Sequence, residues 1–195
     1  PISVSLLMQV MDTGTIVYEL GGWAAPWGIE YRIDTLNAFV LVIVSAIGAV
    51  VMPYARRSVE KEIPVSRIYI FYSMMLLCQT GLMGIAITGD AFNLFVFLEI
   101  SSLSSYVLIS FGTDRRALTA AYRYLIMGTI GATFYIIGVG FMYSATGSLN
   151  IHDLSTLIPE MAGSRTVQAA LAFLTVGLGL KVALFPLHMW LPNAY

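Results

Sequence analysis

Two ionisable side chains lie within apolar stretches of this sequence, where a charge is costly. Glu99 lies near the middle of DAFNLFVFLEISSLSSYVLISF (residues 90–111), and Lys181 lies within GLGLKVALFPLH (residues 177–188). A charge at the centre of a bilayer costs about 2.5–3.5 kcal/mol on insertion scales, so such groups tend to be paired and functional. Burial disfavours the protonated form of a lysine, and a nearby carboxylate favours it. We therefore predict a proton switch controlled by the Glu99–Lys181 separation; a static ion pair between two helices is the alternative.

Hydroxyl groups continue from Glu99 along one side of the same segment. If residues 91–111 form a helix, then Ser102, Tyr106 and Ser110 lie within about 60° of Glu99 on its surface. Hydroxyls spaced about one turn apart can donate and accept hydrogen bonds and can hold water. This stripe is a candidate proton path to the cytoplasmic end of the segment. The alternative is that the serines bond to their own helix or aid packing.

The sequence around Lys181 interrupts a helix. Gly177 and Gly179 precede the lysine and Pro186 follows it, and a proline removes a helical hydrogen bond and clashes with the preceding turn. Interrupted helices at membrane depth line enclosed or wet cavities and form ion sites in many transporters. We therefore predict a discontinuous helix near Lys181. His188, further along, could relay protons because an ordinary histidine titrates near pH ~6.5, or it could be a plain interfacial residue.

The composition indicates an integral membrane protein. Hydrophobic residues make up 58% of the chain and charged residues 11%, whereas soluble domains carry about 25% charged residues. The net charge of −1 argues against a nucleic-acid partner. A single cysteine, Cys78, excludes a disulfide framework, and His152 beside Asp153 supplies too few ligands for a metal site. We expect no metal and no cofactor, because the sequence has no flavin, iron–sulfur or nucleotide motif.

The predicted fold class is all-α, a polytopic bundle of membrane helices in three parts. Residues 1–11 are interpreted as the end of a truncated helix, and residues 35–195 as one partial transmembrane bundle. Between them, residues 12–34 contain strand-like runs around GGWAAPWG, which predicts a small hairpin or loop at the outer surface near residues 15–33. The five predicted spans are residues 36–54, 68–88, 91–111, 124–142 and 166–187.

Small and capping residues refine this outline. Glycines recur in the fourth span at positions 128, 131, 138 and 140, and small residues let membrane helices approach closely. We interpret them as a packing surface. Residues 148–163 are expected to form an interfacial helix on the outer side, which Asn150 could cap.

Basic residues predict the orientation of the spans. Seven of them fall in two loops that five spans place on one side: Arg56, Arg57, Lys61, Arg67, Arg115, Arg116 and Arg123. The opposite side carries Arg32 and Arg165. Because cytoplasmic loops are enriched in lysine and arginine, loops 55–67 and 112–123 are predicted to be cytoplasmic. The protein is then a multi-pass protein of the cell inner (plasma) membrane, with the hairpin facing out.

Three long motifs resemble a known family. GDAFNLFVFLEISSLSSYVLI, RRALTAAYRYLIMGTIGATFYIIGVG and KVALFPLHMWLPNAY are similar to the antiporter-like, proton-conducting membrane subunits of respiratory complex I, membrane-bound hydrogenases and Mrp-type cation/proton antiporters. The resemblance covers residues 34–195. It implies a bundle of about fourteen helices built from two inverted five-helix repeats, with this chain holding the first repeat in part. By position, Glu99 matches the charged residue of the family's fifth helix and Lys181 the lysine of its broken seventh helix.

Details of the motifs separate the branches of this family. The complex I pattern W-L-P-D-A-H is here replaced by a version with Asn193 and Tyr195, and RRSVEKEIP (residues 56–64) is also more similar to the D-type subunits of Mrp antiporters. The resemblance therefore implies proton translocation as a subunit of a multisubunit Na⁺/H⁺ antiporter. The alternatives are a proton-pumping subunit of a complex I-type NADH:quinone oxidoreductase or hydrogenase, which would be an enzyme through its partners, and a passive membrane scaffold. The expected partners are other membrane subunits, the lipid bilayer, protons and monovalent cations.

Overall fold

The structure, a computed structural model, describes residues 2–112 and 115–194. Residues 1, 113–114 and 195 lie outside the described residues. They belong to the predicted first segment, to the predicted loop 112–123 and to the end of the C-terminal motif.

Helices dominate the described chain. Its helices are α1 (Ile2–Thr13), α2 (Thr35–Glu62), α3 (Ile68–Ile87), α4 (Ala91–Ser110), α5 (Arg115–Thr146), α6 (Ile151–Glu160), α7 (Arg165–Lys181) and the short α8 (Leu191–Ala194). Single 3₁₀ turns form at Leu20–Gly22 and Val65–Arg67. Between α1 and α2, strands β1 (Ile16–Glu19) and β2 (Glu30–Ile33) pair antiparallel, with Ile16 opposite Ile33 and Glu19 opposite Glu30.

The fold is that of an all-α, multi-pass integral membrane protein. Within the described residues, four segments are long and apolar enough to cross a bilayer: Thr35–Glu62, Val65–Ile87, Ala91–Ser110 and Arg115–Thr146. Many of their large apolar side chains lie on the outside of the molecule, as in Val50 of α2 and Leu118 of α5. Apolar surface of this extent is stable only when lipid or other apolar partners cover it.

The helix bounds differ from the predicted spans mainly at the charged ends. α2 continues through Pro53 to Glu62, and an exposed ion pair one helical turn apart, Arg56 Nε to Glu60 Oε1 at 3.0 Å, lies on this extension. α5 already begins at Arg115. The predicted loops 55–67 and 112–123 are therefore largely helical. The hydrophobic stretch of a sequence shows which residues face lipid, and the helix can continue beyond it into polar surroundings. The predicted span 166–187 is helical only to Lys181.

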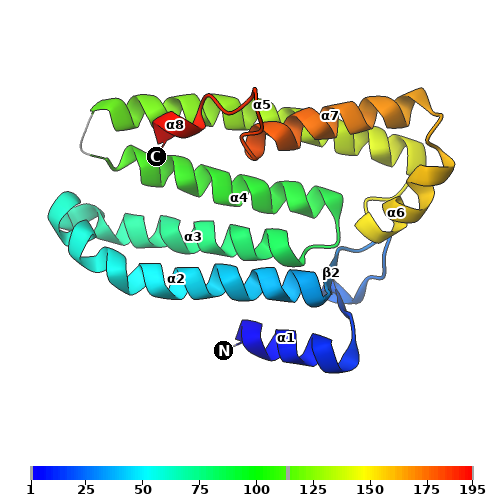
Figure 1. The fold of residues 1–195 in the computed structure, drawn as a ribbon, viewed down its shortest axis with the longest axis horizontal. Coiled ribbons are helices and arrows are strands. Elements are labelled where there is room, and N and C mark those ends of the chain that lie inside the picture. Colours follow the sequence, from blue (N-terminus) through cyan, green and yellow to red (C-terminus); the bar gives the residue numbers. More distant parts are fainter. Residues whose placement is uncertain (1, 113–114, 195) are drawn as a thin grey trace.

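The helices lie side by side in the order α1, α2, α3, α4 and α5, with α7 packed along α5 (Figure 1). A turn of only a few residues joins α3 to α4, which makes them the predicted antiparallel pair. Glycines bring α5 and α7 together: a Cβ at Gly177 would lie 2.6 Å from the backbone nitrogen of Tyr135, and one at Gly131 would lie 3.0 Å from Leu180 Cβ. Gly138 likewise packs on Leu174, whereas a Cβ at Gly140 would meet nothing within 4 Å. The packing role expected of the α5 glycines therefore holds for some of them and not for Gly140.

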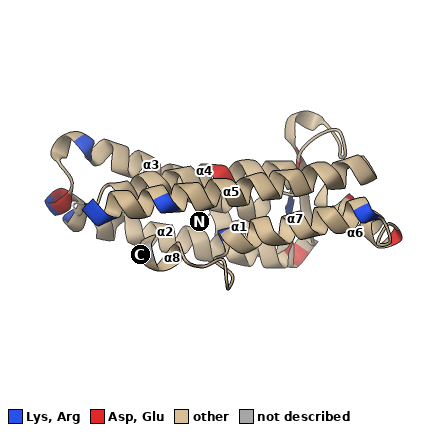
Figure 2. Cartoon of the chain, turned by 90° about the horizontal axis from the view of Figure 1, so that it is seen from above, with Lys and Arg blue, Asp and Glu red and all other residues tan. Residues whose placement is uncertain are grey.

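Charged residues gather toward the two ends of the bundle (Figure 2). We call the end with the α2–α3 connection (residues 63–67) and the start of α5 the basic end. We call the opposite end, with β1, β2 and α6, the hairpin end. Backbone bridges tie the hairpin end together: Tyr31 pairs with Thr88, and Asp90 pairs with Asn150.

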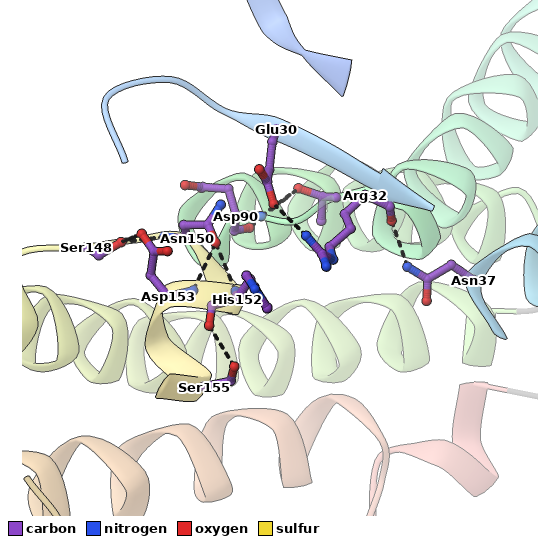
Figure 3. Close-up of polar contacts among 10 residues, drawn as sticks. Glu30, Arg32, Asn37, Asp90, Ser148, Asn150, His152, Asp153 and Ser155 are labelled. Atoms are coloured by element: carbon purple, nitrogen blue, oxygen red, sulfur yellow. Dashed lines mark hydrogen bonds and ion pairs between the residues drawn. The ribbon is translucent and has the colours of Figure 1, made fainter. Parts of the chain in front are cut away.

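Two polar side chains cap helices at the hairpin end (Figure 3). Asp90 Oδ1 accepts from the Asn93 backbone N–H at 2.7 Å and starts α4. Burial raises the pKa of the Asp90 carboxyl, and backbone N–H groups of α4 partly oppose this shift. Asn150 Oδ1 accepts from the N–H groups of His152 and Asp153, which confirms Asn150 as the cap of α6. The Asp90 cap fixes where α4, the helix that carries Glu99, begins.

Candidate functional site

Glu99 and Lys181 form an ion pair between two helices. Lys181 Nζ lies 2.8 Å from Glu99 Oε1, although 82 positions separate the residues in the sequence. The side chain of Lys181 is 8% exposed and that of Glu99 is 24% exposed. The lysine is therefore the more enclosed member, and the carboxylate retains a side that a further group or water could reach.

Ser102 is a second acceptor for the same ammonium group. Lys181 Nζ donates to Ser102 Oγ at 2.9 Å. Ser102 follows Glu99 by three residues on α4, so both side chains lie on one face of that helix. A lysine ammonium has three donors, and two of them are used here. The ammonium group of Lys181 thus lies between a charged acceptor and a neutral hydroxyl.

Lys181 reaches this position because α7 ends at it. Ala183 has a left-handed φ of 55°, a conformation that terminates an α-helix. The N–H of Ala183 donates to the carbonyl of Leu180 at 3.3 Å, and that of Leu184 donates to Gly179 at 2.8 Å, which is the Schellman pattern of helix ends. Pro186 lies beyond this cap, so the helix stops before the proline that the sequence pointed to. A proline shortly after a helix end is common, since it cannot continue the helix.

The other predicted path residues lie in different surroundings. The Tyr106 hydroxyl is buried and has no hydrogen-bond partner among the described residues; it lies against Gly128 of α5. Ser110 donates to its own helix, to the Val107 carbonyl at 2.7 Å, as the packing alternative expects. His188 contacts the Phe185 ring, and its Nδ1 is buried without a partner in the described part of the chain. Only Ser102 of this set therefore bonds directly to the ion pair.

Three aromatic side chains, Tyr106, Tyr124 and Trp190, form a cluster beside the ion pair that the sequence analysis did not predict. The Trp190 indole N–H donates to the Leu180 carbonyl at 3.0 Å, one residue before Lys181. Its ring stacks on Tyr124 of α5, with centroids 4.1 Å apart and an interplanar angle of 4°, and Tyr124 meets Tyr106 edge-on at 4.5 Å. The only sequence signal for Trp190 was its place in the segment KVALFPLHMWLPNAY, which resembles the family. A motif does not reveal which carbonyl an indole bonds.

The side chains at this site are of types that can exchange protons. The described residues contain no group of three or more His, Cys, Asp or Glu side chains that could hold a metal ion. What the geometry supplies is an ammonium, a carboxylate and hydroxyls in a largely enclosed setting between helices. Such a set can hold, pass and release a proton.

Comparison with known proteins identifies the family. Residues 88–195 match the family model described as "NADH:quinone oxidoreductase/Mrp antiporter, TM". The chain belongs to this family of membrane subunits. The match begins at the hairpin end just before α4 and includes Glu99, Lys181 and Trp190.

Relatives of this family member occur in several kinds of membrane complex. It is 50% identical over 178 residues to the N-type subunit of the NADH-quinone oxidoreductase of Desulforudis audaxviator, covering 91% of this chain and 35% of the relative. It is 33% identical over 194 residues to the D-type subunit of the Na⁺/H⁺ antiporter of Alkalihalophilus pseudofirmus, covering 100% of this chain and 39% of the relative. A solved archaeal respiratory complex, the membrane-bound sulfane sulfur reductase, contains a chain that matches with a TM-score of 0.85 and 35% identity, covering 100% of this chain and 39% of that one. The chain thus spans a little over a third of the length of these relatives, which are subunits of multisubunit membrane assemblies.

Proposed function

We propose that this chain translocates protons across the membrane as part of a subunit of a multisubunit Na⁺/H⁺ antiporter, with Glu99 and Lys181 as the residues that carry the proton. The observation that carries this proposal is the position of the Lys181 ammonium, which donates to Glu99 and Ser102 at the point where α7 ends. Family membership supports ion or proton translocation in a multisubunit complex.

The proposed mechanism follows from the distance between two charges. A carboxylate at hydrogen-bonding distance favours the protonated form of a lysine, and an apolar surrounding without that carboxylate disfavours it. Contact with Glu99 therefore keeps Lys181 protonated, and separation favours transfer of its proton to the next acceptor. Such movement would occur at the end of α7, where the chain after Lys181 leaves the helix until residue 191.

A polar route toward the basic end completes the proposal. Ser102 is the first step, since it already accepts from Lys181. Tyr106 and Ser110 follow on the same helix, and His188 lies beyond the end of α7. The unpaired Tyr106 hydroxyl and His188 Nδ1 are buried polar atoms, and such atoms in native proteins are usually satisfied by ordered water. Water at these two positions would extend the route from Ser102.

We further propose that the subunit resides in the cell inner (plasma) membrane with the basic end in the cytoplasm. Both predicted cytoplasmic segments, 55–67 and 112–123, have their described residues toward the basic end of the helices (Figure 1). The hairpin end then faces outward. The positive-inside rule is the physical basis of this assignment.

A second candidate is a proton-pumping subunit of a redox complex. The 50% identity to the N-type subunit of a NADH-quinone oxidoreductase favours it, and the match to an archaeal respiratory complex agrees with it. The same Glu99–Lys181 chemistry would then be driven by electron transfer in partner chains. A passive scaffold, in which the ion pair only joins α4 to α7, is the third possibility.

The test uses inverted membrane vesicles that contain the complete complex. We expect Glu99→Gln and Lys181→Ala each to abolish proton movement, measured with a pH-sensitive dye after addition of Na⁺ or, separately, of NADH. Lys181→Arg should fail as well, because an arginine does not release its proton in this pH range. The matched controls are Glu62→Gln and Lys61→Ala at the exposed basic end, which should transport as the wild type does.

The outcomes separate the candidates. A response to Na⁺ supports the antiporter, and a response to NADH alone supports the redox complex. Removing one partner of a buried pair costs about 3–5 kcal/mol of stability, so assembly of each variant is checked by native electrophoresis. If the double variant Glu99→Ala/Lys181→Ala assembles and transports normally, only the scaffold remains.

A further inference from the structure

The segment that follows Lys181 returns to the backbone of α7. Trp190 lies nine residues after the lysine, and its side chain points back to the helix end, where its N–H donates to the Leu180 carbonyl at 3.0 Å. That carbonyl belongs to the last turn of α7, whose carbonyls have no helical partner. The Ala183 N–H reaches the same oxygen only at 3.3 Å. The indole is therefore a closer donor to this carbonyl than the Ala183 N–H.

Trp190 is itself fixed by a second helix. It is 6% exposed, and its ring stacks face to face on Tyr124 of α5. Tyr124 in turn meets the edge of Tyr106, which is buried on α4. Stacked and edge-to-face aromatic pairs have preferred geometries and resist lateral displacement. The hydrogen bond at Leu180 is thus anchored to α4 and α5 and not to a freely moving loop.

These contacts close a ring around the proposed proton site. Glu99, Ser102 and Tyr106 lie on one face of α4. Lys181 contacts the first two directly, and Trp190 contacts the third through Tyr124. The segment 180–190 is therefore linked to this face of α4 at two places, directly through Lys181 and indirectly through Trp190 and Tyr124 of α5. A shift of the end of α7 would therefore have to break the polar contacts of Lys181 and the aromatic contacts of Trp190, or move their partners as well.

We propose that Trp190 is a positioning residue for Lys181: its indole N–H, held by the stack on Tyr124, sets where the α7 end places the ammonium relative to Glu99 and Ser102. This inference rests on the proposed proton translocation by Glu99 and Lys181. Trp190 contacts neither the Glu99 carboxylate nor the Lys181 ammonium and would act through the backbone carbonyl of Leu180.

Trp190→Phe is the direct test, in vesicles that contain the intact complex. Phenylalanine keeps a six-membered aromatic ring that can face Tyr124, and it removes the N–H that donates to the Leu180 carbonyl together with the five-membered ring that carries it. We expect proton transport to fall about fivefold to tenfold and the midpoint of its pH profile to move by about half a unit or more, because Lys181 contacts the carboxylate less of the time. The matched control is Trp27→Phe at the hairpin end, a tryptophan that is 88% exposed, which should change neither quantity.

Each result has one meaning. If Trp190→Phe has the wild-type rate and pH profile, or a lower rate with an unmoved midpoint, the tryptophan does not position Lys181 and the inference is wrong. If Trp190→Phe does not assemble, Tyr124→Leu removes the stacking partner while the indole N–H remains, and an unmoved midpoint in that variant overturns the inference equally. Glu99→Gln and Lys181→Ala are measured in parallel: normal transport in both refutes the proposed function itself, independently of Trp190.

Discussion

At the scale of single residues, the site depends on one ammonium group with two acceptors of different character. Glu99 offers a charge that Lys181 can approach or leave, whereas Ser102 offers a neutral hydroxyl on the same face of α4. A hydroxyl can accept from the lysine and donate onward at the same time, which an ionised carboxylate cannot do. Ser102 is therefore the residue most suited to connect the ion pair to a route beyond it.

Ser102→Ala removes the hydroxyl and leaves the ion pair in place. A hydrogen bond to a charged group contributes about 1.5–3 kcal/mol, so we expect proton transport to fall at least about tenfold. Ser104→Ala is the control: this serine is also buried on α4, but it donates to the Ile100 carbonyl of its own helix. Transport by Ser104→Ala should stay within about twofold of the wild type. Equal losses in the two variants would mean that Ser102 has no special part in transfer.

Gly128 provides the space in which the Tyr106 hydroxyl lies. A Cβ at Gly128 would collide with that hydroxyl, whereas a Cβ at Gly140 of the same helix would meet nothing within 4 Å. We expect Gly128→Ala to cost about 1–3 kcal/mol by overpacking and to reduce transport by moving Tyr106. The thermal midpoint of the purified protein and the vesicle assay measure the two effects. Gly140→Ala should leave transport unchanged and stabilise the protein by about 0.5–1 kcal/mol, because alanine favours the helix over glycine. A loss as large as that of Gly128→Ala would contradict the steric explanation.

At the scale of elements, the end of α7 decides where the lysine lies. The helix stops through a Schellman cap with an alanine, not a glycine, in the left-handed position. A left-handed conformation costs a non-glycine residue roughly 1–2 kcal/mol, so this end is weaker than it could be. A weak helix end beside Lys181 is consistent with the movement that the proposed mechanism requires.

The same substitution at two places on this segment should have opposite effects. Ala183→Gly relieves the left-handed strain and should stabilise the protein by about 1 kcal/mol. Ala172→Gly, on an exposed position inside α7, should destabilise it by about 0.5–1 kcal/mol through backbone entropy. Thermal unfolding of the purified full-length protein measures both shifts. A lower midpoint for Ala183→Gly would show that the left-handed residue carries no strain.

At the scale of the whole molecule, polar features divide between two ends of a lipid-covered bundle. The hairpin end is joined by backbone bridges and helix caps, and the basic end carries the α2 extension and the start of α5 (Figures 1 and 2). Glu99 and Lys181 lie within the helical region between these ends. The proposed proton route runs from this position toward the basic end along α4, while Phe92 and Phe95 contact each other in the α4 turns nearest the hairpin end.

Site-directed labelling tests the orientation. In a Cys78→Ala background, we expect a cysteine at Ser66 of the basic end to react with a membrane-impermeant maleimide only from the cytoplasmic side. A cysteine at Ser155 of α6, at the hairpin end, should react only from the outside. Both serines are exposed in the structure. The reverse pattern would invert the proposed topology, and labelling of both positions from one side would contradict the arrangement of the helices.

Helical periodicity and hydrophobicity in the sequence predicted much of the fold. The sequence indicated a multi-pass all-α membrane protein, the α3–α4 pair, the cap of α6 and the polar face of α4, because each depends on residues close together in one segment. The helix bounds were less predictable: α2 and α5 continue past the apolar regions, since a helix can extend into water when its side chains are polar. The cap at Ala183 was not readable either, because alanine gives no signal for a left-handed conformation.

The contacts between distant residues were decided only by the tertiary structure. The sequence shows that Glu99 and Lys181 are charged residues within apolar segments, where a charge is unfavourable. Contact between them depends on how α4, α5 and α7 pack, and the glycines of α5 and α7 permit the close approach of these two helices. The same packing makes Ser102 the second acceptor and directs the Trp190 indole to Leu180. Periodicity relates residues along one helix, whereas the faces that meet between helices follow from side-chain shape across several segments at once.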